Sequence, residues 1–252
     1  MQISISINRQ NYSVNTSEGI DISTPIDSKH SVLAYHIPPP TFTPFCAGGF
    51  VGAVEQGGAC NCEDITFNAH GNGTHTECVG HITKERITIN SCLKEFHFAA
   101  RLVSLQAHSL PNGDLVLNVA SLISELDRED LTEALIIRTL PNAENKLQAN
   151  YSGKNPIYLD AELIAFLAAN NVKHLLLDLP SVDREEDGGA LAAHKAFWQY
   201  PENTRTDATI TELIYVPNAV ADGLYLLNLQ IASFESDASP SKPVLYNLLP
   251  NN

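Results

Sequence analysis

A nearly continuous apolar run, VKHLLLDLP (172–180), is the feature that most constrains the fold of this chain. Such a run is typical of a strand buried on both faces, which needs a covering layer on each side. It follows directly on the clearest helix signal of the sequence. Asp160 can cap the free amides of that helix, and Leu163, Ile164 and Leu167 share one of its faces. A helix that leads into a doubly buried strand indicates an α/β architecture.

Further apolar segments are spread evenly along the chain, and most have the period of strands. Ile3, Ile5 and Ile7 alternate with polar residues, as in a strand with one buried face. Other strands are predicted at 97–106, 114–120, 134–140, 211–216 and 223–232, and short helices at 125–133 and 190–198. No internal repeat or low-complexity linker divides the chain. We therefore predict one mixed-sheet α/β domain over residues 1–252.

Charge and composition exclude several classes of partner. The chain has 15 Lys+Arg against 29 Asp+Glu, a net charge of −14, which repels phosphate backbones and anionic lipid surfaces. No apolar run approaches the ~18 residues that span a bilayer. The start of the chain lacks the basic and apolar regions of a secretory signal, and its five cysteines are an odd number. We expect a cytoplasmic protein with reduced thiols that binds neither nucleic acid nor membrane.

Prolines enforce an extended loop around residues 38–50, because proline fixes φ and restrains the residue before it. The loop carries three aromatic residues, Phe42, Phe45 and Phe50. One interpretation is that they pin the loop to the body of the protein. The other is that they form a hydrophobic wall for a substrate, packed against a partner subunit that closes the site.

Three histidines fall within twelve residues of a glycine-rich segment, at His70, His75 and His81. His75 and Glu77 are two residues apart, so in an extended segment their side chains point the same way, as two ligands of one metal must. Imidazole together with carboxylate suits Zn²⁺, Mn²⁺ or Fe²⁺. The alternative is a polar loop whose histidines satisfy backbone groups, but the combined spacing favours a metal site.

This segment resembles the signature of the metal-dependent cyclase family, which includes bacterial kynurenine formamidases and isatin hydrolases. The family pattern is His-x-Gly-Thr-His-x-Asp-x-Pro-x-His, and Gly73, Thr74, His75 and His81 match it in place. The resemblance extends over about the last three-quarters of the chain. It includes LDLPSVD (177–183) and the ending YLLNLQIASFESDASPSKPVL.

Three positions depart from the family pattern. Glu77 stands in place of the aspartate and is one methylene longer, and Val79 stands in place of the proline. The first histidine of the pattern aligns with Gly71, so the nearest candidate, His70, is displaced by one residue. We expect Gly71 and Gly73 to absorb the extra residue as a bulge that returns His70 to the cavity shared by His75 and Glu77.

The resemblance implies a fold, a reaction and a set of site residues. The fold is the swivelling β/β/α type, in homodimers or larger oligomers. The reaction is hydrolysis of a small-molecule amide, formamide or lactam with water activated by one or two divalent ions, zinc first and manganese as the alternative. The implied metal ligands are His70, His75, Glu77, His194 and Glu212, and His81 is the implied general base and acid.

Three functions remain open from the sequence. The first is an amidohydrolase acting on N-formylkynurenine or a similar aryl amide, as in tryptophan catabolism. The second is the same fold acting on another cyclic amide or a lactone, as in isatin hydrolase. The third is a member that binds metal or ligand without turnover. We also expect Asp178 and Asp183 to fix the turn around Pro180, without a chemical role.

Overall fold

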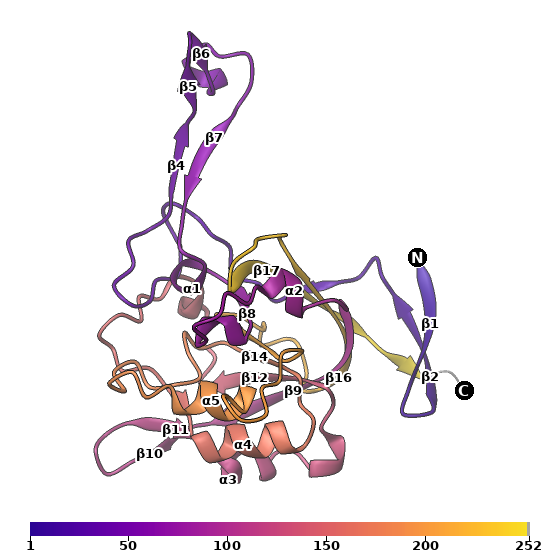
Figure 1. Cartoon of the computed structure of the whole chain (residues 1–252). Helices are drawn as coiled ribbons and strands as arrows, with labels where there is room; N and C mark the ends of the chain where they lie inside the picture. The colour runs from indigo at the N-terminus through magenta and orange to yellow at the C-terminus, as the bar shows by residue number, and fades with distance from the viewer. Residues whose placement is uncertain (251–252) are drawn as a thin grey trace.

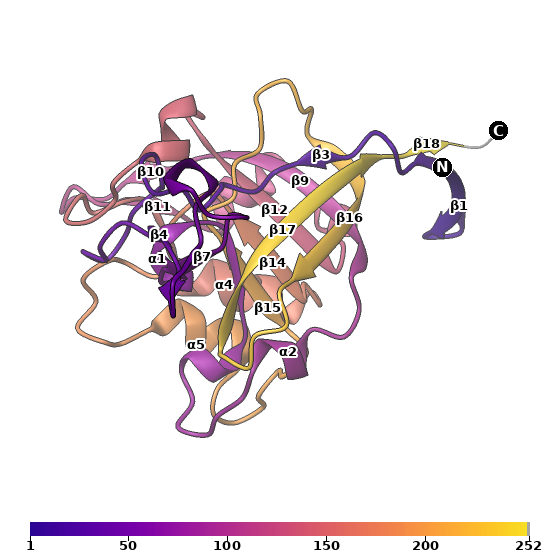
Figure 2. The ribbon, with the colours of Figure 1, turned by 90° about the horizontal axis from the view of Figure 1, so that it is seen from above.

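Seven strands pair in a closed ring at the centre of the molecule. In the computed structural model, which describes residues 1–250, the ring and the short strand at its edge are β3 (Ile20–Asp21), β8 (His75–Glu77), β9 (His97–Gln106), β12 (Ala134–Leu140), β14 (His174–Leu177), β15 (Thr209–Glu212), β16 (Gly223–Ile231) and β17 (Ala238–Asn247). The order is β16-β9-β12-β14-β15-β8-β17, and β17 pairs back with β16. The strands from β9 to β15 are parallel, and β8 and β16 run antiparallel to both neighbours. The result is a mixed barrel (Figure 2).

Both faces of the central strands β12 and β14 are buried, which explains their nearly continuous apolar runs. On β9, Phe98, Ala100 and Leu102 belong to the core inside the barrel, whereas Val103 and Leu105 belong to the core outside it. That outer core is covered by α3 (Val119–Ile123), α4 (Ala161–Ala169) and α5 (Ala192–Trp198). Figure 1 shows these helices together on one side of the sheet. Within residues 1–250 no helix is both long and apolar enough to cross a membrane.

Several predicted elements appear as expected from their periodicity. The strand predicted at 134–140 is β12, and the one at 97–106 is β9. The side chain of Asp160 accepts a hydrogen bond from the Glu162 amide at the start of α4, 3.0 Å away. The apolar face predicted for this helix is buried. The mixed-sheet α/β class predicted from the sequence is confirmed.

Other predicted elements are shorter than expected. The strand predicted at 114–120 is only β11 (Leu115–Leu117), because Asn118 caps the Ser121 amide and begins α3. The helix predicted at 125–133 is a single turn, η3 (Arg128–Asp130). The strand predicted at 211–216 ends at Glu212, because Leu213 has a φ of +57°, outside the extended region.

The remaining elements are small. Both ends of the chain meet in one sheet, in which β2 lies between β1 and β18, and β11 lies between β10 and β13 in another. The bounds are β1 (Gln2–Ile7), β2 (Gln10–Asn15), β10 (His108–Ser109), β13 (Tyr158–Leu159) and β18 (Leu249–Pro250). The short helical turns are α1 (Ala69–Asn72), η2 (Val79–His81), α2 (Ile89–Cys92) and η4 (Glu144–Gln148).

The segment predicted as an extended loop forms an arm instead. Its elements are β4 (Thr41–Pro44), β5 (Cys46–Ala47), β6 (Phe50–Val51), η1 (Val54–Gln56) and β7 (Glu63–Thr66). The hairpin of β4 and β7 carries β5 and β6 far out from the barrel (Figure 1). Phe45 and Phe50 are 40% and 39% exposed, and their ring centroids lie 6.1 Å apart. The interpretation that these aromatics pin a loop to the body is therefore wrong.

A projecting arm with exposed aromatic residues predicts self-association. We expect the chain to be a dimer or a larger oligomer in which the arm packs on a second copy. Light scattering should give a mass of at least twice 27.4 kDa, and the double variant Phe45→Ser and Phe50→Ser should shift the protein toward the monomer. A wild-type monomer at all working concentrations contradicts this expectation.

His174 predicts a specific sensitivity to acid. Its ring is buried, lies 4.0 Å from the Phe98 ring between centroids, and has Nδ1 2.9 Å from Thr209 Oγ1. Burial, together with the charge of Lys173, lowers the pKa of His174 from 6.5 to about 4. In the unfolded chain His174 therefore binds a proton below pH 6.5, whereas in the folded chain it binds one only below about pH 4.

When the pH is lowered from 7 to 5, His174 should lower the free energy of unfolding by about 2 kcal/mol. Denaturant titrations at the two pH values measure it. The loss should be absent in His174→Gln and unchanged in His97→Gln, an exposed histidine on β9. Equal pH dependence in both variants contradicts the prediction.

Candidate metal centre

The register of β8 and β15 builds the centre of the site. His75 and Glu77 alternate with Thr76, so they share one face of β8, and Thr76 shares a 2.8 Å hydrogen bond with Thr211 on the other face. Glu212 stands directly opposite His75 across the antiparallel pair. His75 Nε2 and Glu212 Oε2 are 3.4 Å apart. Glu212 is thus the last residue of its strand.

Two buried atoms of this group lack partners, and both are suited to bind a cation. The Nδ1 of His75 lies 3.1 Å from the carbonyl of Gly73, which only accepts, so Nδ1 donates and Nε2 presents a lone pair. Among residues 1–250, neither this Nε2 nor Glu77 Oε2 has a hydrogen-bond partner. Ligand atoms of His75, Glu77 and Glu212 all lie within 4.8 Å of one another. These three residues therefore fit a divalent metal ion.

His194 reaches the same centre from α5. Asp183 accepts hydrogen bonds from the Ala193 and His194 amides at 2.8 and 3.1 Å, and it lies 2.6 Å from His194 Nδ1. This leaves His194 Nε2 facing Glu77 Oε1 at 3.2 Å. Burial lowers the pKa of His194, but Asp183 and Glu77 outweigh it and raise that pKa to about 10. The expectation that Asp183 only fixes a turn is wrong, because its carboxylate orients a site histidine.

His70 also points into the cavity, although not through a bulge. Residues 69–72 form the helical turn α1, and the Asn68 side chain accepts a hydrogen bond from the His70 amide. His70 Nδ1 lies 3.2 Å from Glu77 Oε2, and its ring centroid is 5.1 Å from that of His75. The predicted bulge is wrong because one turn of helix absorbs the extra residue.

His81 forms a second donor group with His70 and Glu77, and their ligand atoms also lie within 4.8 Å of one another. His81 Nδ1 is 3.8 Å from Glu77 Oε2. Burial raises the pKa of Glu77, but the charge of His81 and the contacts with His194 and His70 hold it well below its usual range. Glu77 is thus shared by both donor groups, which gives room for one ion or two.

Asp237 is the site residue that the sequence did not reveal. Its Oδ2 lies 2.9 Å from His70 Nε2 and 3.2 Å from His81 Nδ1. It lies in the ending that resembles the family, where the motif comparison assigned it no role. Asp178, the other acidic residue expected at the turn, is buried. It forms a salt bridge with Lys146, with Nζ 2.8 Å from Asp178 Oδ2.

All members of the two donor groups except fully buried His75 line a pocket of about 310 Å³. Its lining includes His70, Glu77, His81, His194 and Glu212, with Tyr35, Ile37 and Leu191 as the apolar part. Within the described chain, Phe42, Phe45 and Phe50 are not among the lining residues, so a single copy does not use them as the predicted substrate wall. Of the five histidines outside this site, His174 is buried, and the other four are exposed: His30, His36, His97 and His108.

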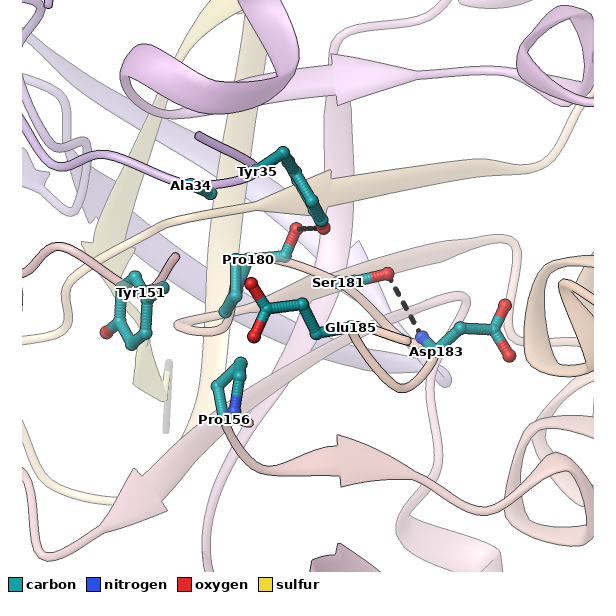
Figure 3. Close-up of a pocket in the computed structure, with 8 residues that line it drawn as sticks. All are labelled: Ala34, Tyr35, Tyr151, Pro156, Pro180, Ser181, Asp183 and Glu185. Atoms are coloured by element: carbon teal, nitrogen blue, oxygen red, sulfur yellow. Dashed lines mark hydrogen bonds between the residues drawn. The ribbon is translucent and has the colours of Figure 1, made fainter. Parts of the chain in front are cut away.

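A narrow recess of about 10 Å³ adjoins this pocket (Figure 3). Tyr35 and Glu185 line both spaces, and the recess continues between Tyr151, Pro156 and Pro180. Tyr35 donates its hydroxyl to the Pro180 carbonyl at 2.6 Å, which ties the segment before β4 to the turn after β14. A volume this small admits about one water molecule.

The fold and the site define a barrel protein with a buried histidine–carboxylate centre. A sequence model of the family described as Putative cyclase matches residues 20–184, which is 165 of the 252 residues. The chain belongs to this family, and the resemblance drawn from its motifs is confirmed.

Similar proteins extend over nearly the whole chain. The kynurenine formamidase of Bacillus cytotoxicus is 26% identical over 239 residues, 92% of this chain and 99% of the relative. The kynurenine formamidase of Bacillus anthracis is 25% identical with the same coverage.

Solved structures show the same fold. One described as a potential metal-dependent hydrolase with cyclase activity has a TM-score of 0.65 at 16% identity, and the match covers 91% of this chain and 97% of that one. Isatin hydrolase A from Ralstonia solanacearum has a TM-score of 0.66 at 13% identity, with 91% of each chain covered.

The geometry predicts tight binding of a divalent ion. Metal-free protein should take up one or two Zn²⁺ per chain, measured by calorimetry and elemental analysis. His75→Ala and Glu212→Gln should each weaken binding by more than ~100-fold, because loss of a direct ligand exceeds the effect of losing an outer partner. His108→Ala, an exposed histidine on β10, is the matched control. Unchanged affinity in both site variants excludes this centre.

Proposed function

We propose that this chain is a metal-dependent amidohydrolase that cleaves an aryl formamide, with N-formylkynurenine as the first candidate substrate. In this reaction the C–N bond of the formamide breaks, water supplies the new C–O bond, and formate and an aryl amine leave. The enzyme would then release kynurenine, as in tryptophan catabolism. Relatives named kynurenine formamidase, matched over nearly their full length, support this assignment.

The observation that carries the proposal is the pair of orphaned buried atoms, His75 Nε2 and Glu77 Oε2. Leaving such atoms unpaired is costly, so their presence at the centre of a histidine–carboxylate cluster supports a resident cation. The donor set of imidazoles and carboxylates suits zinc, with manganese as the alternative. When bound, such an ion supplies Lewis-acid chemistry, polarising a carbonyl and acidifying a water molecule.

His75, Glu77 and Glu212 would hold this ion, with His194 and His70 completing the donor set around Glu77. His81 lies at the side of the same pocket and would move the protons of the reaction. It takes a proton from the attacking water and returns one to the leaving nitrogen. The apolar lining by Ile37 and Leu191 would receive the aryl ring of the substrate.

The proposal also covers the compartment, the oligomeric state and the partners of the protein. Five unpaired cysteines support a reducing compartment, hence the cytoplasm. The exposed arm supports a homo-oligomer, and the net charge of −14 argues against nucleic acid and anionic membranes as partners.

A substrate panel tests this function. The zinc-loaded protein is assayed with N-formylkynurenine, isatin and simple anilides, and we expect the highest kcat/KM on the formamide. His81→Gln should keep its zinc and lower kcat by ~10²–10⁴, the range for a lost general acid–base. His36→Gln, an exposed histidine, is the control.

Each alternative gives a distinct result. Preference for isatin assigns a cyclic amide in place of the formamide. Binding of zinc without turnover of any substrate assigns a non-catalytic member. Loss of zinc in His81→Gln makes His81 a ligand, as its place in the second donor group allows.

A further inference from the structure

We propose that Asp237 is a positioning residue that fixes the tautomers of two site histidines, His70 and His81. With its hydrogen bonds in place, the free nitrogen of His70 points to the donor centre and the free nitrogen of His81 points to a substrate in the pocket. The inference rests on the proposed function, to which it adds a residue. It begins from a single carboxylate oxygen, Asp237 Oδ2, that faces both rings, His70 Nε2 at 2.9 Å and His81 Nδ1 at 3.2 Å.

An ionised carboxylate only accepts hydrogen bonds, so both nitrogens that face it must carry protons. Asp237 Oδ2 is the acceptor that the two imidazole nitrogens share, at 2.9 and 3.2 Å. His70 is therefore protonated at Nε2, and His81 at Nδ1. The two rings are 4.5 Å apart between centroids and share this one acceptor.

The consequence is different for each ring. The remaining nitrogen of His70 is Nδ1, which faces Glu77 Oε2 at 3.2 Å and so points to the donor centre. The remaining nitrogen of His81 is Nε2, which is free to exchange protons with a substrate in the pocket. A carboxylate that sets ring orientation in this way also raises ligand basicity. Asp183 has the same relation to His194 across the site.

The backbone holds Asp237 firmly in this place. Its carbonyl accepts a hydrogen bond from the Cys78 amide at 3.0 Å, and the next residue, Ala238, pairs with Glu77 in the β17–β8 register. Ser236 donates its hydroxyl to Asp237 Oδ1 at 3.0 Å, so Oδ2 is left for the histidines. The carboxylate is thus fixed relative to the strand that carries Glu77.

The test follows the ring nitrogens directly. In the zinc-loaded protein, long-range ¹H–¹⁵N spectra of labelled histidine should show a protected Nδ1–H on His81 and a protected Nε2–H on His70. Asp237→Ala should lose both signals, weaken zinc affinity ~10–100-fold and lower kcat with little change in KM. Glu235→Gln is the matched control, because this carboxylate lies in the same loop but bonds Thr88 and Asn90.

Asp237→Glu restores a carboxylate and should recover part of the zinc affinity and of both signals. If Asp237→Ala does not fold, Asp237→Asn, which keeps the side-chain shape without the charge, is measured in its place. Unchanged ring signals and zinc affinity within twofold of wild type overturn the proposal. Because neither readout needs a substrate, a failure to hydrolyse formamides leaves this test intact.

Discussion

The site depends on one short strand, β8, held antiparallel between β15 and β17. Its three residues bring two other parts of the chain into register, so that Glu212 meets His75 and Ala238 meets Glu77. The ring cannot close without this strand, because it joins the parallel half of the barrel to β17. A shift of one residue would turn His75 and Glu77 to the other face. Fold and chemistry are therefore fixed by the same backbone hydrogen bonds.

Much of the barrel could be predicted because its strands are buried on both faces. The runs at 134–140 and 172–180 are nearly continuous in apolar residues, a pattern typical of a strand covered on both faces. By contrast, β8 has three residues and no apolar period, so its strand character comes from its neighbours. The arm had an even weaker signal, since its prolines and glycines indicate a loop whether or not a hairpin forms.

The same contrast applies to the site. His75 and Glu77 could be recognised because their spacing alone places two donors on one face of a strand. Asp237 and Asp183 act from segments 160 and 106 residues after Glu77, and only the closure of the barrel and the start of α5 bring them to the histidines. A carboxylate that orients a histidine can come from any part of the chain. Motif spacing therefore reveals the histidine ligand but not the carboxylate that orients it.

Two of the three departures of this chain from the family motif, at His70 and Glu77, belong to one rearrangement. A side chain at position 71 would be crowded, because an added Cβ would lie 2.5 Å from Ile37 Cδ1, which would have to move, and 3.1 Å from the Ala34 carbonyl oxygen. The histidine of this chain stands at position 70, on the helical turn α1. The extra methylene of Glu77 carries the carboxylate outward to meet it, with Oε2 3.2 Å from His70 Nδ1 while Oε1 still reaches His194. An aspartate at position 77 would withdraw that oxygen from the displaced ring, so each departure makes sense only with the other.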